Sequence, residues 1–280
     1  MQRILTALVA LPVIIASIWF DQLALVFVLL AAAALMAGLY EFWILSARRD
    51  MKAMRELGTI FAVAFLVLFY FRAAADAPVL IPMALVAFVI TALAAAALRG
   101  APFERMMGSA GATVLGVLYV VFLGGHIIAL RTTFQPQLAR DLLFFFLLVV
   151  MGSDTAAYYT GRAFGRHKLA PKISPGKTWE GAVGGMCASL LAATLAHFWF
   201  FPELSLRVAL PLAAVMNALG VVGDLTESTL KRGAGAKDAA KILPGHGGLL
   251  DRLDSLLFNA PLLYYFAVNY FPAHYQKLIP

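Results

Sequence analysis

Long apolar runs dominate this sequence and decide what it can fold into. They recur along the whole chain, and 62% of the residues are hydrophobic while only 13% are charged. Soluble domains carry about a quarter charged residues, whereas a helix needs about 20 mostly apolar residues to cross a bilayer. The sequence therefore predicts an all-α, polytopic integral membrane protein.

The apolar runs delimit about nine transmembrane helices of the length that a bilayer requires. Eight stays open as an alternative, because the third run is short and only Asp21 and Gln22 separate the first two. The expected spans are 4–20, 23–45, 58–72, 78–98, 107–130, 142–161, 181–201, 207–230 and 249–271.

Basic residues gather in alternate loops. The four loops 46–57, 99–106, 162–180 and 231–252 hold 16 Lys and Arg residues, and 6 lie elsewhere. Because short cytoplasmic loops carry an excess of Lys and Arg, these loops are expected in the cytoplasm. Both chain ends are then expected on the opposite side. The net charge of +7 is attributed to this topology, to an anionic substrate, or to both, so a nucleic-acid partner is not expected.

Polar residues are concentrated in the second half of the chain. We therefore expect a transmembrane scaffold over 1–135, and catalytic helices with cytoplasmic loops over 136–280. The lone cysteine, Cys187, excludes a disulfide within the chain. The glycine pair Gly181 and Gly185 predicts a close helix contact, either within one protomer or between protomers.

The segment 217–254 contains most of the candidate chemistry. A helix would place Asp224, Glu227, Ser228 and Lys231 on one face, because they are spaced i, i+3, i+4 and i+7. An acidic side chain in an apolar helix normally faces protein or water. This face is therefore expected to form one wall of a polar cavity.

A glycine-rich stretch follows that helix. Gly233 and Gly235 are expected to end it, and the loop continues through Pro244 to Gly248. Glycines allow the backbone to approach a ligand closely, and free amides accept phosphate oxygens. The last helix then begins with Asp251 and Asp254 on one face. Carboxylates beside several cations suit phosphate chemistry with Mg²⁺.

The same segment resembles a known family. Its pattern of Ser228-x-x-Lys231-Arg232, Lys237-Asp238 and Pro244-x-His246-Gly247-Gly248-x-x-Asp251-Arg252-x-Asp254 is similar to the signature of phosphatidate cytidylyltransferases, or CDP-diglyceride synthases. The stretch Ser174-Pro175-Gly176-Lys177-Thr178-Trp179-Glu180-Gly181 also resembles that family. At a helix N-terminus, its hydroxyls and lysine would bind an anion.

The resemblance implies that CTP and phosphatidic acid react to give CDP-diacylglycerol and pyrophosphate. It further implies a homodimer, and Mg²⁺ is the expected cofactor, with one or two metal ions. The Lys and Arg count places the active site of this multi-pass protein on the cytoplasmic side, and the inner membrane is expected because the sequence shows no nuclear or organelle signal. The implied metal ligands are Asp224 and Asp251. The implied catalytic residues are Asp224, Lys231, Asp251, Asp254 and His246. The implied substrate-binding residues are Ser174, Lys177, Thr178, Ser228, Arg232, Lys237, Asp238, Gly247, Gly248 and Arg252.

Three alternatives stay open at this stage. A CDP-alcohol phosphotransferase would need an Asp-Gly pair, which the chain lacks. A secondary transporter would place ionisable residues near the middle of the membrane, as Asp154 and Asp224 permit. A structural membrane subunit would leave the polar segment 217–254 without a role.

Overall fold

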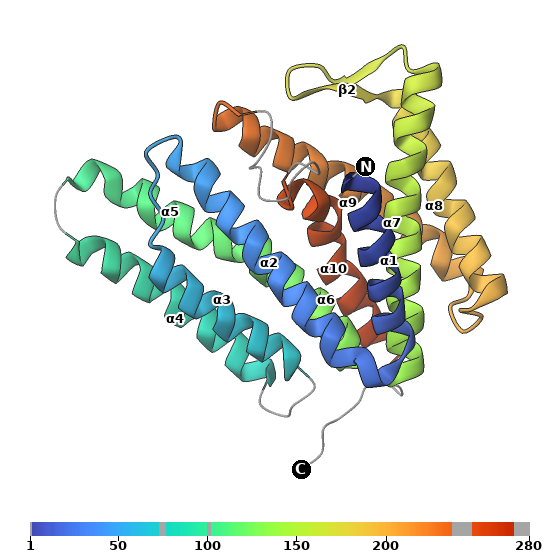
Figure 1. Ribbon diagram of the computed structural model, residues 1–280, viewed down its shortest axis with the longest axis horizontal. Coiled ribbons are helices and arrows are strands. Elements are labelled where there is room, and N and C mark those ends of the chain that lie inside the picture. Colours follow the sequence, from blue (N-terminus) through green and yellow to red (C-terminus); the bar gives the residue numbers. More distant parts are fainter. Residues whose placement is uncertain (1, 73–76, 100–101, 237–247, 272–280) are drawn as a thin grey trace.

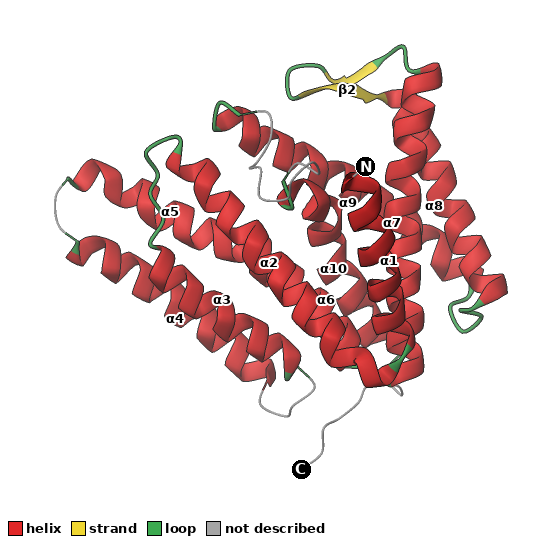
Figure 2. Ribbon diagram, viewed as in Figure 1, coloured by secondary structure: helices red, strands yellow, loops and turns green. Residues whose placement is uncertain are grey.

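The computed structural model describes residues 2–72, 77–99, 102–236 and 248–271, with the backbone only at 2–10 and 77–78. The described chain is a bundle of antiparallel helices (Figures 1 and 2). The predicted all-α membrane fold is confirmed. The described part adds one two-stranded antiparallel hairpin, in which Lys168 pairs with Thr178 and Ala170 with Ser174.

The helices of the N-terminal half follow the predicted apolar runs. They are α1 (Gln2–Trp19), α2 (Ala24–Ala47), α3 (Arg55–Tyr70) and α4 (Ala77–Leu98), followed by one continuous rod of α5 (Met106–Gly116), a π-helical turn (Val117–Phe122) and α6 (Leu123–Thr132). Short 3₁₀ turns, Asp21–Leu23 and Phe103–Arg105, precede α2 and α5.

The C-terminal half contributes longer helices and the hairpin. It contains α7 (Pro136–Phe164), β1 (Lys168–Ala170), β2 (Ser174–Thr178), α8 (Trp179–Trp199), α9 (Leu206–Gly233) and α10 (Leu250–Tyr270). Six helical segments of the described chain are long and apolar enough to cross a membrane. The predicted number of about nine spans is thus not confirmed, because α3 has 16 residues and α10 is more polar.

Most of the expected cytoplasmic loops connect helices at one end of the bundle (Figure 1). We call this the basic end: α2, α4, α7 and α9 end there, and α3, α5, α8 and α10 begin there. The helix α1 also begins at the basic end, so the expectation that both chain ends lie opposite was wrong for the N-terminal one. An odd number of antiparallel helices necessarily begins and finishes at opposite ends.

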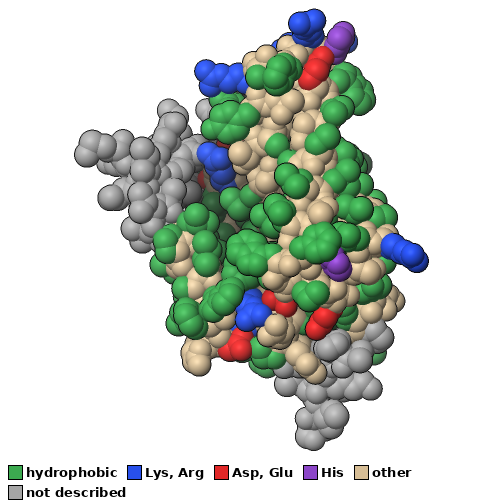
Figure 3. Space-filling model, turned by 90° about the vertical axis from the view of Figure 1, so that its right-hand side faces the viewer, with side chains coloured by type: hydrophobic (Ala, Val, Ile, Leu, Met, Phe, Trp, Pro, Cys, Tyr) green, Lys and Arg blue, Asp and Glu red, His purple; other side chains and the backbone are tan. Residues whose placement is uncertain are grey.

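The helix α10 joins the two halves of the chain. It packs against α2 and α6 from the N-terminal half and against α7 and α9 from the C-terminal half. Leu253, Leu257 and Leu263 of α10 are buried in these contacts. On the face formed around α7 and α8, hydrophobic side chains cover the middle and charged ones gather near both ends (Figure 3). This pattern is typical of a protein surrounded by lipid.

Glycines bring α7 and α8 into close contact. A Cβ at Gly181 would meet the Ala157 carbonyl oxygen at 2.8 Å, and one at Gly185 would meet the Ser153 carbonyl oxygen at 3.1 Å. Small residues permit such backbone approaches between helices in a membrane. The predicted Gly181–Gly185 contact therefore lies within one chain, against α7.

Candidate active site

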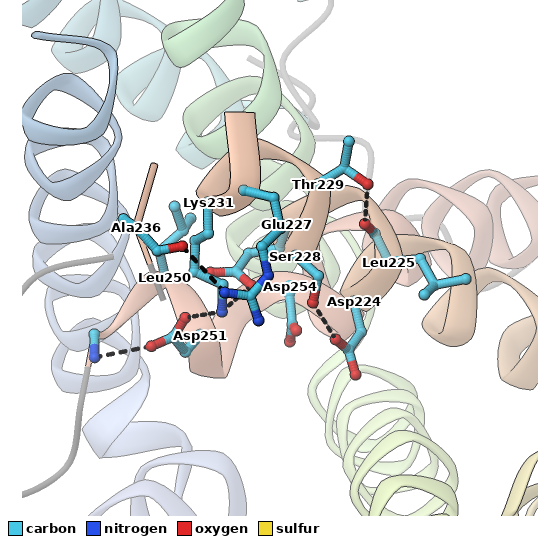
Figure 4. Close-up of polar contacts among 12 residues, drawn as sticks. Asp224, Leu225, Glu227, Ser228, Thr229, Lys231, Ala236, Leu250, Asp251 and Asp254 are labelled. Carbon is cyan, nitrogen blue, oxygen red and sulfur yellow. Dashed lines mark hydrogen bonds and ion pairs between the residues drawn. The ribbon is translucent and has the colours of Figure 1, made fainter. Parts of the chain in front are cut away.

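Four polar residues of α9 follow the predicted stripe. Asp224, Glu227, Ser228 and Lys231 lie along the part of α9 that meets the first turns of α10 (Figure 4). The helix ends as predicted: Gly233 is its last residue, and Gly235 has a φ of +67°, which a glycine adopts without strain. The Ala236 amide then donates to the Lys231 carbonyl oxygen over 2.8 Å.

Lys231 joins α9 to α10 through two carboxylates. Its Nζ lies 2.5 Å from Glu227 Oε2 and 2.6 Å from Asp251 Oδ1. The Glu227 side chain is 1% exposed, and its second oxygen has no partner among the described residues. A buried charge is costly without a partner. Lys231 is therefore required for the stability of the site when both Glu227 and Asp251 are ionised.

Lys177 forms a second link, between the hairpin and α9. Its Nζ lies 2.5 Å from Asp224 Oδ2, and the Ser228 hydroxyl donates to Asp224 Oδ1 over 3.4 Å. The Lys177 side chain is 22% exposed and that of Asp224 36% exposed. This pair is therefore open to solvent and to a ligand, unlike Glu227.

Two further carboxylates lie close to Asp224. The buried Asp254 is within electrostatic range of Asp224, Asp154 and Lys177. Asp154 comes from α7 and interacts by hydrogen bonding with the Ser255 side chain. The site thus collects Asp154, Asp224, Glu227, Asp251 and Asp254 from three helices. Among the described residues, Lys177 and Lys231 pair with three of these five carboxylates.

The first turn of α10 is capped from two directions. Asp251 reaches back to accept the Gly248 amide at 3.1 Å, which is half of a capping box. Glu41 of α2, which is fully buried, accepts the Leu250 amide at 2.8 Å. These amides have no partner inside the helix, so the two carboxylates fix the turn on which Asp251 and Asp254 lie.

Two arginines bind backbone carbonyl groups at the C-terminal end of α9. Arg49, in the turn that follows α2, donates from Nε to the Gly233 carbonyl oxygen at 2.6 Å. Arg232 donates to the Ile173 carbonyl oxygen at 3.2 Å and to that of Ala236 at 3.4 Å. Arg232, predicted to bind substrate, therefore also ties the hairpin to the end of α9.

Two residues of the anion-binding stretch have structural partners. Thr178 is buried and accepts the Gly181 amide at 3.1 Å, so its hydroxyl is the N-cap of α8. Glu180 accepts the amides of Arg166 and His167 and contacts His167 Nδ1 at 2.7 Å. Both contacts hold the hairpin that carries Lys177. The substrate-binding role predicted for Thr178 stays a prediction.

Tyr119 was not anticipated by the sequence. It lies in the π-helical turn, is 6% exposed, and has a hydroxyl with no partner among the described residues. The charges of Asp254, Glu227, Asp224 and Asp251 all act on it. π-Helical turns are frequent at functional sites. Only the conformation identifies this tyrosine, because its sequence surroundings are purely apolar.

The remaining predicted residues are only partly placed. Ser174 begins β2 and is half-buried, and Arg252 lies exposed on the first turn of α10. Lys237, Asp238, His246 and Gly247 lie outside the described residues. Their predicted roles therefore rest on the sequence pattern.

A metal ion is compatible with the chemistry of the site. Mg²⁺ binds oxygen ligands, commonly one or two carboxylates together with substrate phosphates. Asp224 and Asp251, the predicted ligands, lie on neighbouring helix ends, and each pairs with a different lysine. Among the described residues, no three or more acidic, histidine or cysteine side chains form a ready-made metal cage. The carboxylates favour a cation at this site, which the phosphates of the substrates would help to coordinate.

Comparisons with known proteins agree along the chain. A sequence model of the cytidylyltransferase family matches residues 1–270. The phosphatidate cytidylyltransferase of Pseudomonas aeruginosa is 35% identical over 266 residues, covering 93% of this chain and 94% of that protein. The phosphatidate cytidylyltransferase of Haemophilus influenzae is 44% identical over 138 residues, or 48% of each chain. That of Brucella suis is 46% identical over 129 residues, covering 44% of this chain and 45% of the relative. The match thus spans about half the length of the latter two.

Proposed function

The chain belongs to the cytidylyltransferase family of membrane nucleotidyltransferases, and we propose that it acts as a phosphatidate cytidylyltransferase. It would transfer the cytidylyl group of CTP to phosphatidic acid and release pyrophosphate. One observation carries the proposal: two lysine–carboxylate pairs, Lys177–Asp224 and Lys231–Asp251, lie where α9 and α10 meet at the basic end. Such a site brings cations to phosphates beside a lipid surface.

The reaction mainly requires two anions to be brought together. A phosphate oxygen of phosphatidic acid attacks the α-phosphorus of CTP, a new P–O bond forms, and the α–β bridging oxygen leaves with pyrophosphate. The nucleophile is already ionised near neutral pH, so a strong general base is not needed. Catalysis then consists of orientation and of charge placed against the phosphates.

Lys177 and Lys231 have the position and charge for that task. Both ammonium groups lie at the site and are held by carboxylates that fix their direction. The Ser228 hydroxyl and the Gly248 amide donate to Asp224 and Asp251, so they help to position these two carboxylates beside the lysines. Asp154 and Asp254 would tune the electrostatic environment of Lys177.

Mg²⁺ is the proposed cofactor, with Asp224 and Asp251 as its ligands and Asp254 as a further candidate. When bound, the metal would neutralise charge that develops on the phosphates. The carboxylates gathered at the site support this assignment. Lys237, Asp238, His246, Gly247, Arg232 and Arg252 are proposed to contact the nucleotide or the lipid phosphate.

The cellular setting follows from the charge distribution. The basic end is proposed to face the cytoplasm of a bacterial inner membrane, because Lys and Arg favour that side. CTP is then available from solution and phosphatidic acid from the bilayer. A homodimer is proposed by family resemblance alone.

The experiment supplies purified protein with radiolabelled CTP, phosphatidic acid and Mg²⁺. It measures lipid-extractable cytidine together with released pyrophosphate. Wild-type protein is expected to form both in equal amounts. Asp251→Asn is expected to lose about 100-fold or more in kcat, the usual scale for an electrostatic catalytic group. The matched control is Glu104→Gln, an exposed acid at the same end of the bundle.

Two results would contradict the proposal. One is the absence of lipid-linked cytidine with folded wild-type protein. The other is full activity of Asp251→Asn. A transporter would instead move a solute across sealed vesicles without chemical conversion.

A further inference from the structure

A polar cavity lies at the basic end, between elements of the N-terminal half. Its volume is about 170 Å³, and it is lined by Asp50, Lys52, Ala96, Arg99, Pro102, Arg105, Met106 and Ser109. These residues come from the segment after α2, the end of α4 and the start of α5. None of them belongs to the lysine–carboxylate pairs of the active site.

Its wall is held by specific contacts. The Ser109 hydroxyl donates to the Lys52 carbonyl oxygen at 2.6 Å, and the Met54 amide donates to the Thr113 hydroxyl at 2.8 Å. A Cβ at Gly108 would meet Met51 Cγ at 3.1 Å, so this glycine lets the segment lie against α5. The segment after α2 is therefore fixed against α5.

The cavity is cationic. Three basic side chains, Lys52, Arg99 and Arg105, face a single acid, Asp50, which pairs with Arg105 at 3.2 Å. Asp50 has a φ of +61°, a conformation that non-glycine residues rarely adopt. Lys52 and Arg99 form no ion pair with any described residue. Two positive charges are thus available to an anion.

Exposed apolar side chains lie beside these charges. Leu98 is 87% exposed, Met107 86% and Phe103 69%. Each is within two residues of a basic residue of the cavity. In a membrane protein such side chains enter the acyl region, so the cavity opens at the level of the lipid headgroups. A soluble anion would gain nothing from this rim.

We propose that this cavity binds the phosphate headgroup of an anionic phospholipid, while its apolar rim contacts the acyl chains. Basic pockets between transmembrane helices on the cytoplasmic side are suited to such headgroups. Lys52 and Arg99 would contact the phosphate, and Arg105 would be shared between the lipid and Asp50. The site is separate from the proposed catalytic site and does not depend on the proposed reaction.

The test counts lipids bound to the full-length protein in a neutral detergent by native mass spectrometry. The titrant is phosphatidylglycerol, which is anionic but not the proposed substrate. Each basic residue near a membrane contributes about fivefold in affinity, so Lys52→Gln with Arg99→Gln should weaken the tightest binding event about thirtyfold. The single variant Lys52→Gln, with an expected loss of about fivefold, serves if the double variant does not fold.

The control removes the same charge elsewhere at the basic end. Arg48→Gln with Lys168→Gln changes two exposed residues that do not line the cavity, and should leave the tight event intact. Phosphatidylcholine is expected not to bind there, and millimolar inorganic phosphate is expected not to displace phosphatidylglycerol. Equal losses in both double variants, equal binding of phosphatidylcholine, or displacement by phosphate would each overturn the assignment to an anionic lipid.

Discussion

Glu41 provides the sharpest test of how the site is held. It is the buried α2 carboxylate that accepts the Leu250 amide at 2.8 Å, one residue before Asp251. Its other oxygen has no partner among the described residues. The contact therefore stabilises the first turn of α10 at the cost of burying a charge. Replacing Glu41 separates these two effects.

Two replacements of Glu41 are expected to differ strongly in their effect on activity. Glu41→Leu leaves the Leu250 amide buried without an acceptor, which costs about 1–3 kcal/mol. If that cost falls on the first turn of α10, about 2 kcal/mol reduces its population about 30-fold. Glu41→Gln keeps an acceptor oxygen and loses only the charge, which contributes about 0.3–1 kcal/mol at a helix N-terminus. The glutamine variant should therefore retain most of the activity.

Two measurements check this reasoning. Initial rates give kcat and KM for both substrates, and Glu41→Leu is expected to lower kcat more than tenfold. Hydrogen–deuterium exchange should show faster exchange of the 248–256 backbone in the same variant. Ser46→Ala is the matched control, because Ser46 is also buried on α2 but its hydroxyl donates to the Trp43 carbonyl oxygen of its own helix. Equal activity of the leucine and glutamine variants, or unchanged exchange at 248–256, would refute the capping role.

Three other predictions follow from the contacts. Lys231→Met leaves two carboxylates without their cation and should destabilise the protein by about 3–5 kcal/mol. The added substitution Glu227→Gln should restore part of the thermal stability but not the cytidylyl transfer. Gly184→Ala places a Cβ against the Thr160 side chain of α7 and should lower the stability measured by thermal unfolding by about 1–3 kcal/mol. Gly152→Ala has open space around its Cβ and should stabilise α7 by about 0.5–1 kcal/mol. Chelation with EDTA should abolish lipid-linked cytidine formation and added Mg²⁺ should restore it, while persistence of full activity in EDTA would refute the metal proposal.

Features of the structure that depend on local sequence patterns could be predicted from the sequence. Apolar runs identify helices because a bilayer admits few alternatives, and the stripe from Asp224 to Lys231 follows from helical periodicity alone. The end of α9 at Gly233 was predictable because glycine is unfavourable inside a helix. The number of spans was not, because short or polar helices such as α3 and α10 depend on neighbouring helices for burial.

Contacts between distant segments could not be predicted. Glu41 and Leu250 are separated by 209 positions, and Arg49 and Gly233 by 184. Nothing in the local pattern around Glu41 identifies its partner. Thr178 was predicted to bind an anion, although its hydroxyl accepts the Gly181 amide and caps α8 in the structure. The backbone conformation decides such cases, because a hydroxyl or carboxylate serves equally well as a cap or as a ligand.

The N-terminal half is therefore not only a scaffold, because it also holds parts of the candidate catalytic site in place. Glu41 of α2 and Arg49 in the turn that follows α2 hold the two helix ends that carry the candidate chemistry. Arg49 places a cation on the carbonyl end of α9, and Glu41 places an anion on the amide end of α10. Each charge has the sign that the helix dipole favours. Since residues 234–249 connect these two ends, α2 and the turn after it fix the positions between which that connection must run. Mutations in α2 should consequently affect catalysis without touching either substrate.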